Sequence, residues 1–119
     1  METYIISNIP PSKKNSKRIV CRGNRPLLLP SESYVKWHAE AMGELKPQIK
    51  GEKIIKCEKI KIEFWHKYQR KWDLDNKAST IFDALVDVGI LEDDNWSVVP
   101  HLELIYVQAK VNKTLIFIT

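Results

Sequence analysis

The chain has 119 residues and a mass of 13.9 kDa, which fits one domain over residues 1–119. Hydrophobic residues make up 44% of it and charged residues 29%, a composition and periodicity that argue against disorder. No apolar run approaches the length of a membrane span, so we expect a cytoplasmic protein. Its net charge of +4 favours a polyanionic partner. The two cysteines, Cys21 and Cys57, lack metal-binding or redox spacing and are expected to be free thiols.

The first half of the chain predicts a strand, a hairpin and a helix. A short strand at residues 3–7 is ended by two prolines. The runs RIVC and PLLL flank Gly23-Asn24 and predict a small hairpin. Ser31 is a good N-cap for a helix to about residue 43, with Val35, His38, Ala39 and Met42 as its apolar stripe. We expect His38 to be a packed boundary histidine.

The second half predicts three strands and one helix. Apolar and polar residues alternate in the clearest strand, at residues 53–66. A helix at residues 76–88 carries an apolar face and can end at Gly89. Strands at 96–109 and 114–119 follow, and Asn112-Lys113 between them predicts a hairpin turn. The sum is an α+β domain, a mixed sheet of about four strands covered by two helices.

Two basic segments are candidate contacts for a polyanion. Residues 12–25 hold six basic residues and no acid, and residues 67–72 hold three more beside Tyr68 and Trp72. Lysine, arginine and asparagine bind phosphates, and aromatic rings can stack on unpaired bases or wedge between them. The alternative interpretation is that both basic segments are ordinary solvated loops. The candidate contacts are Lys13, Lys14, Asn15, Lys17, Arg18, Lys67, Arg70 and Lys71.

The segment WDLDNKASTIFDALVDVGILEDD, residues 72–94, holds seven of the fifteen acidic residues and one basic residue, Lys77. Like charges repel, and a divalent cation bound by oxygen ligands is the usual offset. An extended backbone would place Asp73 and Asp75 on one side. Without further information, capping of a helix by Asp75 or Asn76 explains the same pattern.

The acidic segment resembles the signature of the RusA family of Holliday junction resolvases. That signature has an Asp-x-Asp-Asn motif, an Asp-Ala-Leu helix, a glycine and an Asp-Asp pair, matched here without a gap by 73–76, 83–85, Gly89 and 93–94. Residues 10–15 and a later Leu-Pro also resemble the family. One departure is Ser79, which stands where the family commonly has a lysine one helical turn after the second motif aspartate.

The resemblance implies a homodimer that cuts branched DNA and is encoded by a phage or its host. Hydrolysis of a phosphodiester needs an activated water and neutralised charge, which carboxylate-held Mg²⁺ supplies. Asp73, Asp75 and Asp94 occupy the catalytic positions and are the expected Mg²⁺ ligands. Asp93 is a further ligand candidate, and Lys77 is a candidate replacement for the lysine absent at Ser79.

Asp83 is treated separately from these ligands. It lies eight residues after Asp75, about 12 Å along a helix axis, which is too far to share an ion. We expect it to contact a partner subunit or a basic loop.

The leading hypothesis is a Mg²⁺-dependent endonuclease that resolves four-way junctions by paired nicks. One alternative is a branched-DNA-binding protein that cuts weakly or not at all, as the Ser79 departure allows. The other is a metal-dependent nuclease acting on different branched or single-stranded DNA.

Overall fold

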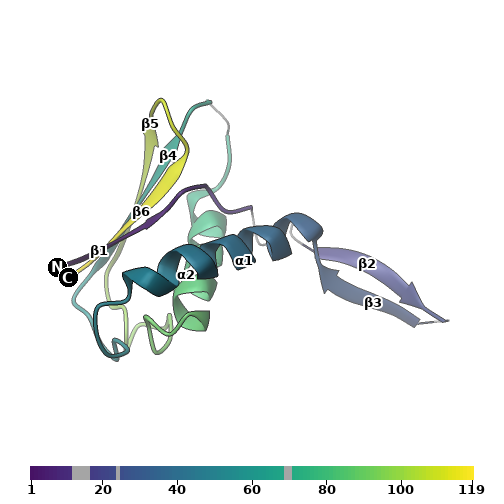
Figure 1. The fold of residues 1–119 in the computed structure, drawn as a ribbon, viewed down its shortest axis with the longest axis horizontal. Helices are drawn as coiled ribbons and strands as arrows, with labels where there is room; N and C mark the ends of the chain where they lie inside the picture. Colours follow the sequence, from purple (N-terminus) through teal and green to yellow (C-terminus); the bar gives the residue numbers. More distant parts are fainter. Residues whose placement is uncertain (12–16, 24, 69–70) are drawn as a thin grey trace.

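A mixed four-stranded sheet is the centre of the molecule (Figure 1). The structure is a computed structural model that describes residues 1–11, 17–23, 25–68 and 71–119, with the backbone alone in 17–22 and 25–30. The sheet has the order β1-β6-β4-β5, where β1 is Glu2–Ile6, β4 Ile60–His66, β5 Leu102–Gln108 and β6 Lys113–Ile118. β6 is antiparallel to β1 and β4, whereas β4 and β5 are parallel. The predicted α+β fold is confirmed.

Strands β2 (Lys17–Arg22) and β3 (Arg25–Pro30) form a separate antiparallel hairpin. Gly23, in the turn between them, has a φ of +61°, a conformation that glycine adopts without steric cost. Figure 1 shows the hairpin projecting beyond the N-terminal end of helix α1, away from the sheet. The predicted hairpin around Gly23 is therefore confirmed.

Helix α1 (Glu32–Leu45) continues into a short 3-10 helix, η2 (Lys46–Gln48). The Ser31 hydroxyl accepts a hydrogen bond of 3.2 Å from the backbone N–H of Tyr34, so the predicted N-cap is confirmed. The predicted apolar stripe is wrong at Val35 and Ala39, whereas Met42 packs against the core and His38 is half-buried. The helix buries Trp37, Ala41 and Leu45, which are four residues apart, and it exposes Val35 and Ala39. The bulk of the indole decides which face turns inward, because it covers the most apolar area.

Helix α2 (Leu74–Asp87) packs against α1 and β5. Its predicted apolar face is confirmed, with Ala78, Ile81, Phe82 and Leu85 buried and Val88 half-buried at the C-cap. The inward residues of β4 meet this core, and each is fully buried: Ile60, Ile62 and Phe64. Gly89 has a φ of +90° and ends the helix, as predicted.

β4, α2 and β5 form a crossover unit. Parallel neighbours cannot be joined by a tight turn, and α2 supplies the long connection between β4 and β5. Because α2 runs back along the sheet, the connection from β4 to α2 and the connection from α2 to β5 lie at opposite ends of this helix. The chain after α2 is held by a bridge between Ile54 and Leu91, with hydrogen bonds of 2.8 and 2.9 Å.

Three predictions about strands need correction. The strand predicted at 53–66 begins only at Ile60, and the one predicted at 96–109 begins only at Leu102. Residues 96–98 form a turn instead, in which the N–H of Val98 donates to the carbonyl of Asn95. The predicted hairpin at Asn112-Lys113 is wrong, because β4 lies between β5 and β6 in the sheet. Local alternation cannot reveal that a strand from an earlier part of the chain inserts between the two.

None of the helices in the described residues is long and apolar enough to cross a membrane. Cys57 is a free, buried thiol, and burial is the main reason that its pKa is raised. The side chain of Cys21 lies outside the described atoms.

Candidate active site

The acidic pair Asp73 and Asp75 lies at the N-terminal end of α2, where the chain leaves β4. Asp73 is the N-cap, with φ −79° and ψ 126°, and Leu74 already belongs to the helix. The predicted extended Asp73-Leu74-Asp75 segment is therefore wrong, and so is capping by Asp75 or Asn76. The helix starts earlier because Leu74 turns inward and is packed against the core.

Asn76 links the two carboxylates. Its side-chain Nδ2 donates to Asp73 Oδ2 at 3.3 Å, and its backbone N–H donates to Asp75 Oδ1 at 2.9 Å. Both aspartates are exposed, so each keeps oxygen atoms available to an incoming group. The positive end of the helix dipole also favours negative charge there. Asn76 therefore holds the two carboxylates in position relative to each other.

A hollow of about 390 Å³ adjoins Asp73, lined by Lys71, Trp72, Leu74 and Tyr106 as well. Trp72 is half-buried and makes edge-to-face contacts with Phe64, His66 and Tyr106, at centroid distances of 5.7, 6.1 and 5.7 Å. Because three other rings hold the Trp72 ring in place, it is poorly placed to insert between DNA bases. Tyr68, at 66% exposure, is freer to stack on a base.

Lys77 is held beside the acidic pair by contacts of its own. Its Nζ donates a hydrogen bond of 2.8 Å to the carbonyl of Pro10 and lies 5.2 Å from the centroid of the Trp72 ring. The ammonium therefore helps to fix the start of α2 against the N-terminal segment. Ser79, where the family lysine would stand, is half-buried on the same helix.

Asp93 and Asp94 belong to a second acidic group, beyond the other end of α2. The Asp94 N–H donates to Asp93 Oδ1 at 2.7 Å, and this bond is the main cause of a lowered pKa at Asp93. Burial raises the pKa of Asp94, and the side chain of Asp93 and the charges of Asp93 and Asp83 raise it further. The charge of Asp83 thus acts on Asp94, although the two residues are eleven positions apart in the sequence.

The three predicted ligands Asp73, Asp75 and Asp94 are not assembled by this chain into one centre. Among the described residues, no group of three or more His, Cys, Asp or Glu side chains is arranged to hold a metal ion. The crossover explains the separation, because the two flanks of α2 leave the helix at opposite ends. Asp73 and Asp75 alone still fit Mg²⁺, which takes one or two carboxylates and completes its shell with water and phosphate oxygens.

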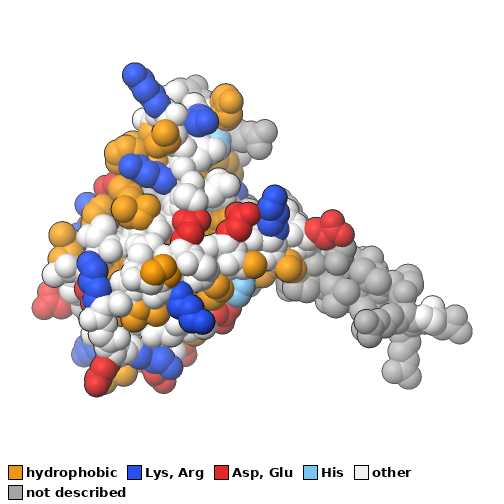
Figure 2. All heavy atoms as spheres, in the orientation of Figure 1, with side chains coloured by type: hydrophobic (Ala, Val, Ile, Leu, Met, Phe, Trp, Pro, Cys, Tyr) orange, Lys and Arg blue, Asp and Glu red, His pale blue; other side chains and the backbone are white. Residues whose placement is uncertain are grey.

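The predicted DNA contacts are described only in part. Lys67 and Lys71 are exposed, on the connection between β4 and α2. Asn112 Oδ1 accepts a hydrogen bond of 2.9 Å from the Lys67 N–H, so the β5–β6 connection with exposed Lys110 lies beside it. Sequence reasoning missed Lys110, because only the sheet order brings it there. Figure 2 shows Lys and Arg side chains at this end of the molecule (top).

The remaining predicted contacts lie outside the described residues or side chains. Lys13, Lys14, Asn15 and Arg70 fall outside the described residues, and Lys17 and Arg18 are described by their backbone in β2 alone. The contacts of His38 and His101 lie away from the acidic pair. His38 bonds Asp87 at 2.8 Å between the helices, as a boundary residue, and His101 lies 3.8 Å from Glu103.

This chain is similar to known endodeoxyribonucleases. A family model described as "Endodeoxyribonuclease RusA" matches residues 8–119. The chain is also 30% identical, over 95 residues, to a protein of Aquifex aeolicus (strain VF5) named "Crossover junction endodeoxyribonuclease RusA". That match covers 80% of this chain and 72% of the relative. The chain belongs to the RusA family of endodeoxyribonucleases.

Proposed function

We propose that this protein is a Mg²⁺-dependent endonuclease that resolves four-way DNA junctions by paired, symmetric nicks. The observation that carries the proposal is the exposed pair Asp73 and Asp75, fixed through Asn76 at the N-terminal end of α2. The family and the named activity of the Aquifex aeolicus relative support the DNA substrate. The exposed lysines on the neighbouring connections support binding to a polyanion.

In this proposal Asp73 and Asp75 hold the metal and Asn76 keeps their carboxylates in position. A Mg²⁺ held by these residues would supply charge neutralisation at the scissile phosphate and would lower the pKa of a water bound to it. Lys67 and Lys71 bind phosphates on either side of the cut. The family resemblance adds Asp94 as a further metal ligand. For Asp94 to bind the same ion, the segment with Asp93 and Asp94 would have to move towards Asp73 and Asp75.

A homodimer is part of the proposal, because a four-way junction offers two equivalent strands to a two-fold symmetric enzyme. Each subunit would contribute one acidic pair and make one nick. The measurement is the mass in solution by light scattering, with and without junction DNA. A protein mass of 13.9 kDa in both conditions, after the mass of the DNA is subtracted, would contradict the dimer.

The first experiment is cleavage of a labelled four-way junction in Mg²⁺ by the wild type, Asp75→Asn and Asp87→Asn. We expect symmetric paired nicks from the wild type, and a loss of cleavage with retained junction binding for Asp75→Asn. Asp87→Asn is the matched control, because Asp87 bonds His38 at the far end of the helix. Equal cleavage by Asp75→Asn and the wild type would exclude the acidic pair as the metal site.

A junction-binding protein that cuts weakly is the second candidate, favoured by two observations. By the family resemblance Ser79 stands where a lysine is common, and the ammonium of Lys77 donates a hydrogen bond to the carbonyl of Pro10. The variant Ser79→Lys separates the two candidates. A large gain in cleavage over the wild type would support the weakly active protein, whereas unchanged cleavage would support a wild type that is already competent.

A further inference from the structure

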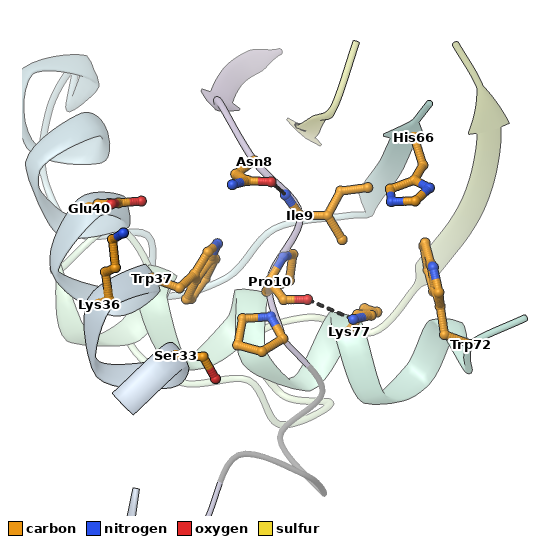
Figure 3. Close-up of a pocket in the computed structure, with 11 residues that line it drawn as sticks. Asn8, Ile9, Pro10, Ser33, Lys36, Trp37, Glu40, His66, Trp72 and Lys77 are labelled. Carbon is orange, nitrogen blue, oxygen red and sulfur yellow. Dashed lines mark hydrogen bonds between the residues drawn. The ribbon is translucent and has the colours of Figure 1, made fainter. Parts of the chain in front are cut away.

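A second hollow, of about 440 Å³, lies on the other side of Trp72, between α1 and the start of α2. Figure 3 shows Lys36, Trp37 and Glu40 on the α1 side and His66, Trp72 and Lys77 on the other. Asn8, Ile9 and Pro10 run down the middle of this view. We call this hollow the Trp37 pocket.

The wall of the Trp37 pocket contains an unsatisfied hydrogen-bond donor. Trp37 is 5% exposed, and among the described residues its indole Nε1 is the buried side-chain polar atom without a hydrogen-bond partner. Figure 3 shows this nitrogen on the edge of the ring that faces Asn8 and Glu40. Buried indole N–H groups usually find an acceptor, so an orphaned one at a pocket wall calls for an explanation.

We propose that the Trp37 pocket receives an unstacked nucleobase from the branch point of the junction. This inference rests on the proposed function and names the feature of the substrate that the protein would recognise. An acceptor atom on the base edge takes the Trp37 N–H, and Lys36 binds the phosphate that flanks the base. The nitrogen is closed off in the free protein, so the lining side chains must shift as the base enters.

The lining chemistry fits a base better than a free phosphate. Glu40 contributes a carboxylate, which repels an anion but can accept a hydrogen bond from an exocyclic amino group. Trp72 and His66, which are half-buried, supply the aromatic surfaces on which a base can stack. Proteins that act on branched or single strands commonly read unstacked bases by such a combination.

The position of the pocket also fits. Trp72 lines both this pocket and the hollow beside Asp73, so the two spaces share one wall. A base held in the Trp37 pocket would belong to a nucleotide near the phosphate that reaches the acidic pair. Occupation would thereby place the branch point next to the cut and give the selectivity for branched DNA.

The test is the affinity for two four-way junctions, measured by fluorescence anisotropy in EDTA so that no strand is cut. One junction is intact and the other has abasic sites at the branch-point nucleotides. The variant Trp37→Phe keeps the ring and removes the N–H. Trp65→Phe is the matched control, because its indole donates to Glu63 and its residue is not among those that line the pocket.

We expect Trp37→Phe to weaken binding of the intact junction about three- to tenfold, the effect of one hydrogen bond, and to leave binding of the abasic junction unchanged. Trp65→Phe should change neither. Equal losses on both junctions, or no loss on either, would overturn the inference.

The wild type alone provides a second readout that does not depend on folding of a variant. It should bind the abasic junction more weakly than the intact one, and equal affinities would overturn the inference too. Failure of the proposed function looks different. In that case the wild type would not prefer either junction to a plain duplex, and the pocket assignment would fall with it.

Discussion

The ammonium of Lys77 donates a hydrogen bond of 2.8 Å to the carbonyl of Pro10, and so joins the start of α2 to a segment 67 residues earlier. Three residues later, the Thr80 hydroxyl donates 3.1 Å to the carbonyl of Pro11. Proline has no backbone N–H, so Pro10 and Pro11 cannot donate hydrogen bonds to a neighbouring strand. The helix that carries the acidic pair is therefore positioned by the N-terminal segment as well as by the sheet.

Thr80 tests how much this contact stabilises the fold. Thr80 is fully buried, and Thr80→Val keeps its shape but removes the hydroxyl. We expect a loss of about 1–3 kcal/mol in the free energy of unfolding, because the half-buried carbonyl of Pro11 loses its donor. Chemical denaturation measures it. Thr80→Ser is the matched control that restores the hydroxyl, and a Thr80→Val as stable as the wild type would show that Pro11 has another partner.

Local pattern predicted what local forces decide. Ile60, Ile62 and Phe64 alternate as a strand buried on one face must, and Ala78 and Leu85 recur at helical spacing. The first residue of the acidic helix could not be predicted from the sequence, because Leu74 becomes helical through its packing against the core. In α1, apolar residues lie on more than one face of the helix, and tertiary contacts determine that the face with Trp37 is buried.

Long-range pairing decided the rest. The insertion of β4 between β5 and β6 is a matter of strand pairing across the chain, and no turn signal at Asn112 records it. That same order makes α2 a crossover, which parts Asp73 from Asp94. The resemblance named the acidic residues, but residue types in a motif carry no information on the distance between them.

Gly89 and Gly43 should respond oppositely to alanine. Gly89 has a φ of +90°, which strains any residue with a Cβ, so Gly89→Ala should cost about 1–2 kcal/mol. Gly43 lies in α1, and nothing lies within 4 Å of a Cβ built there. Gly43→Ala should therefore stabilise by about 0.5–1 kcal/mol, through helix propensity. Thermal unfolding of both variants checks the signs, and a neutral Gly89→Ala would show that the C-terminal turn of α2 rearranges.

Tyr68 should matter for DNA and not for the fold. Its ring is 66% exposed, so Tyr68→Ala should leave the melting temperature unchanged. If the ring stacks on an unpaired base, junction binding should weaken by about 1–3 kcal/mol, and Tyr68→Phe should bind like the wild type. Equal affinity of Tyr68→Ala and the wild type would show that Tyr68 does not stack on a base, and the Trp37 pocket would then be the remaining candidate for base contacts.

Lys71 should contribute one phosphate contact beside the acidic pair. Each neutralised phosphate releases counterions, so the slope of log affinity against log salt should become less steep by about 0.9 in Lys71→Gln. Lys50→Gln is the matched control, because Lys50 is also exposed but lies in the loop after η2. Titrations at several salt concentrations with Asp75→Asn in the background would measure binding without cleavage. An unchanged slope for Lys71→Gln would mean that DNA approaches α2 from another side, since a lysine flanking the hollow at Asp73 could not then lie along the bound strand.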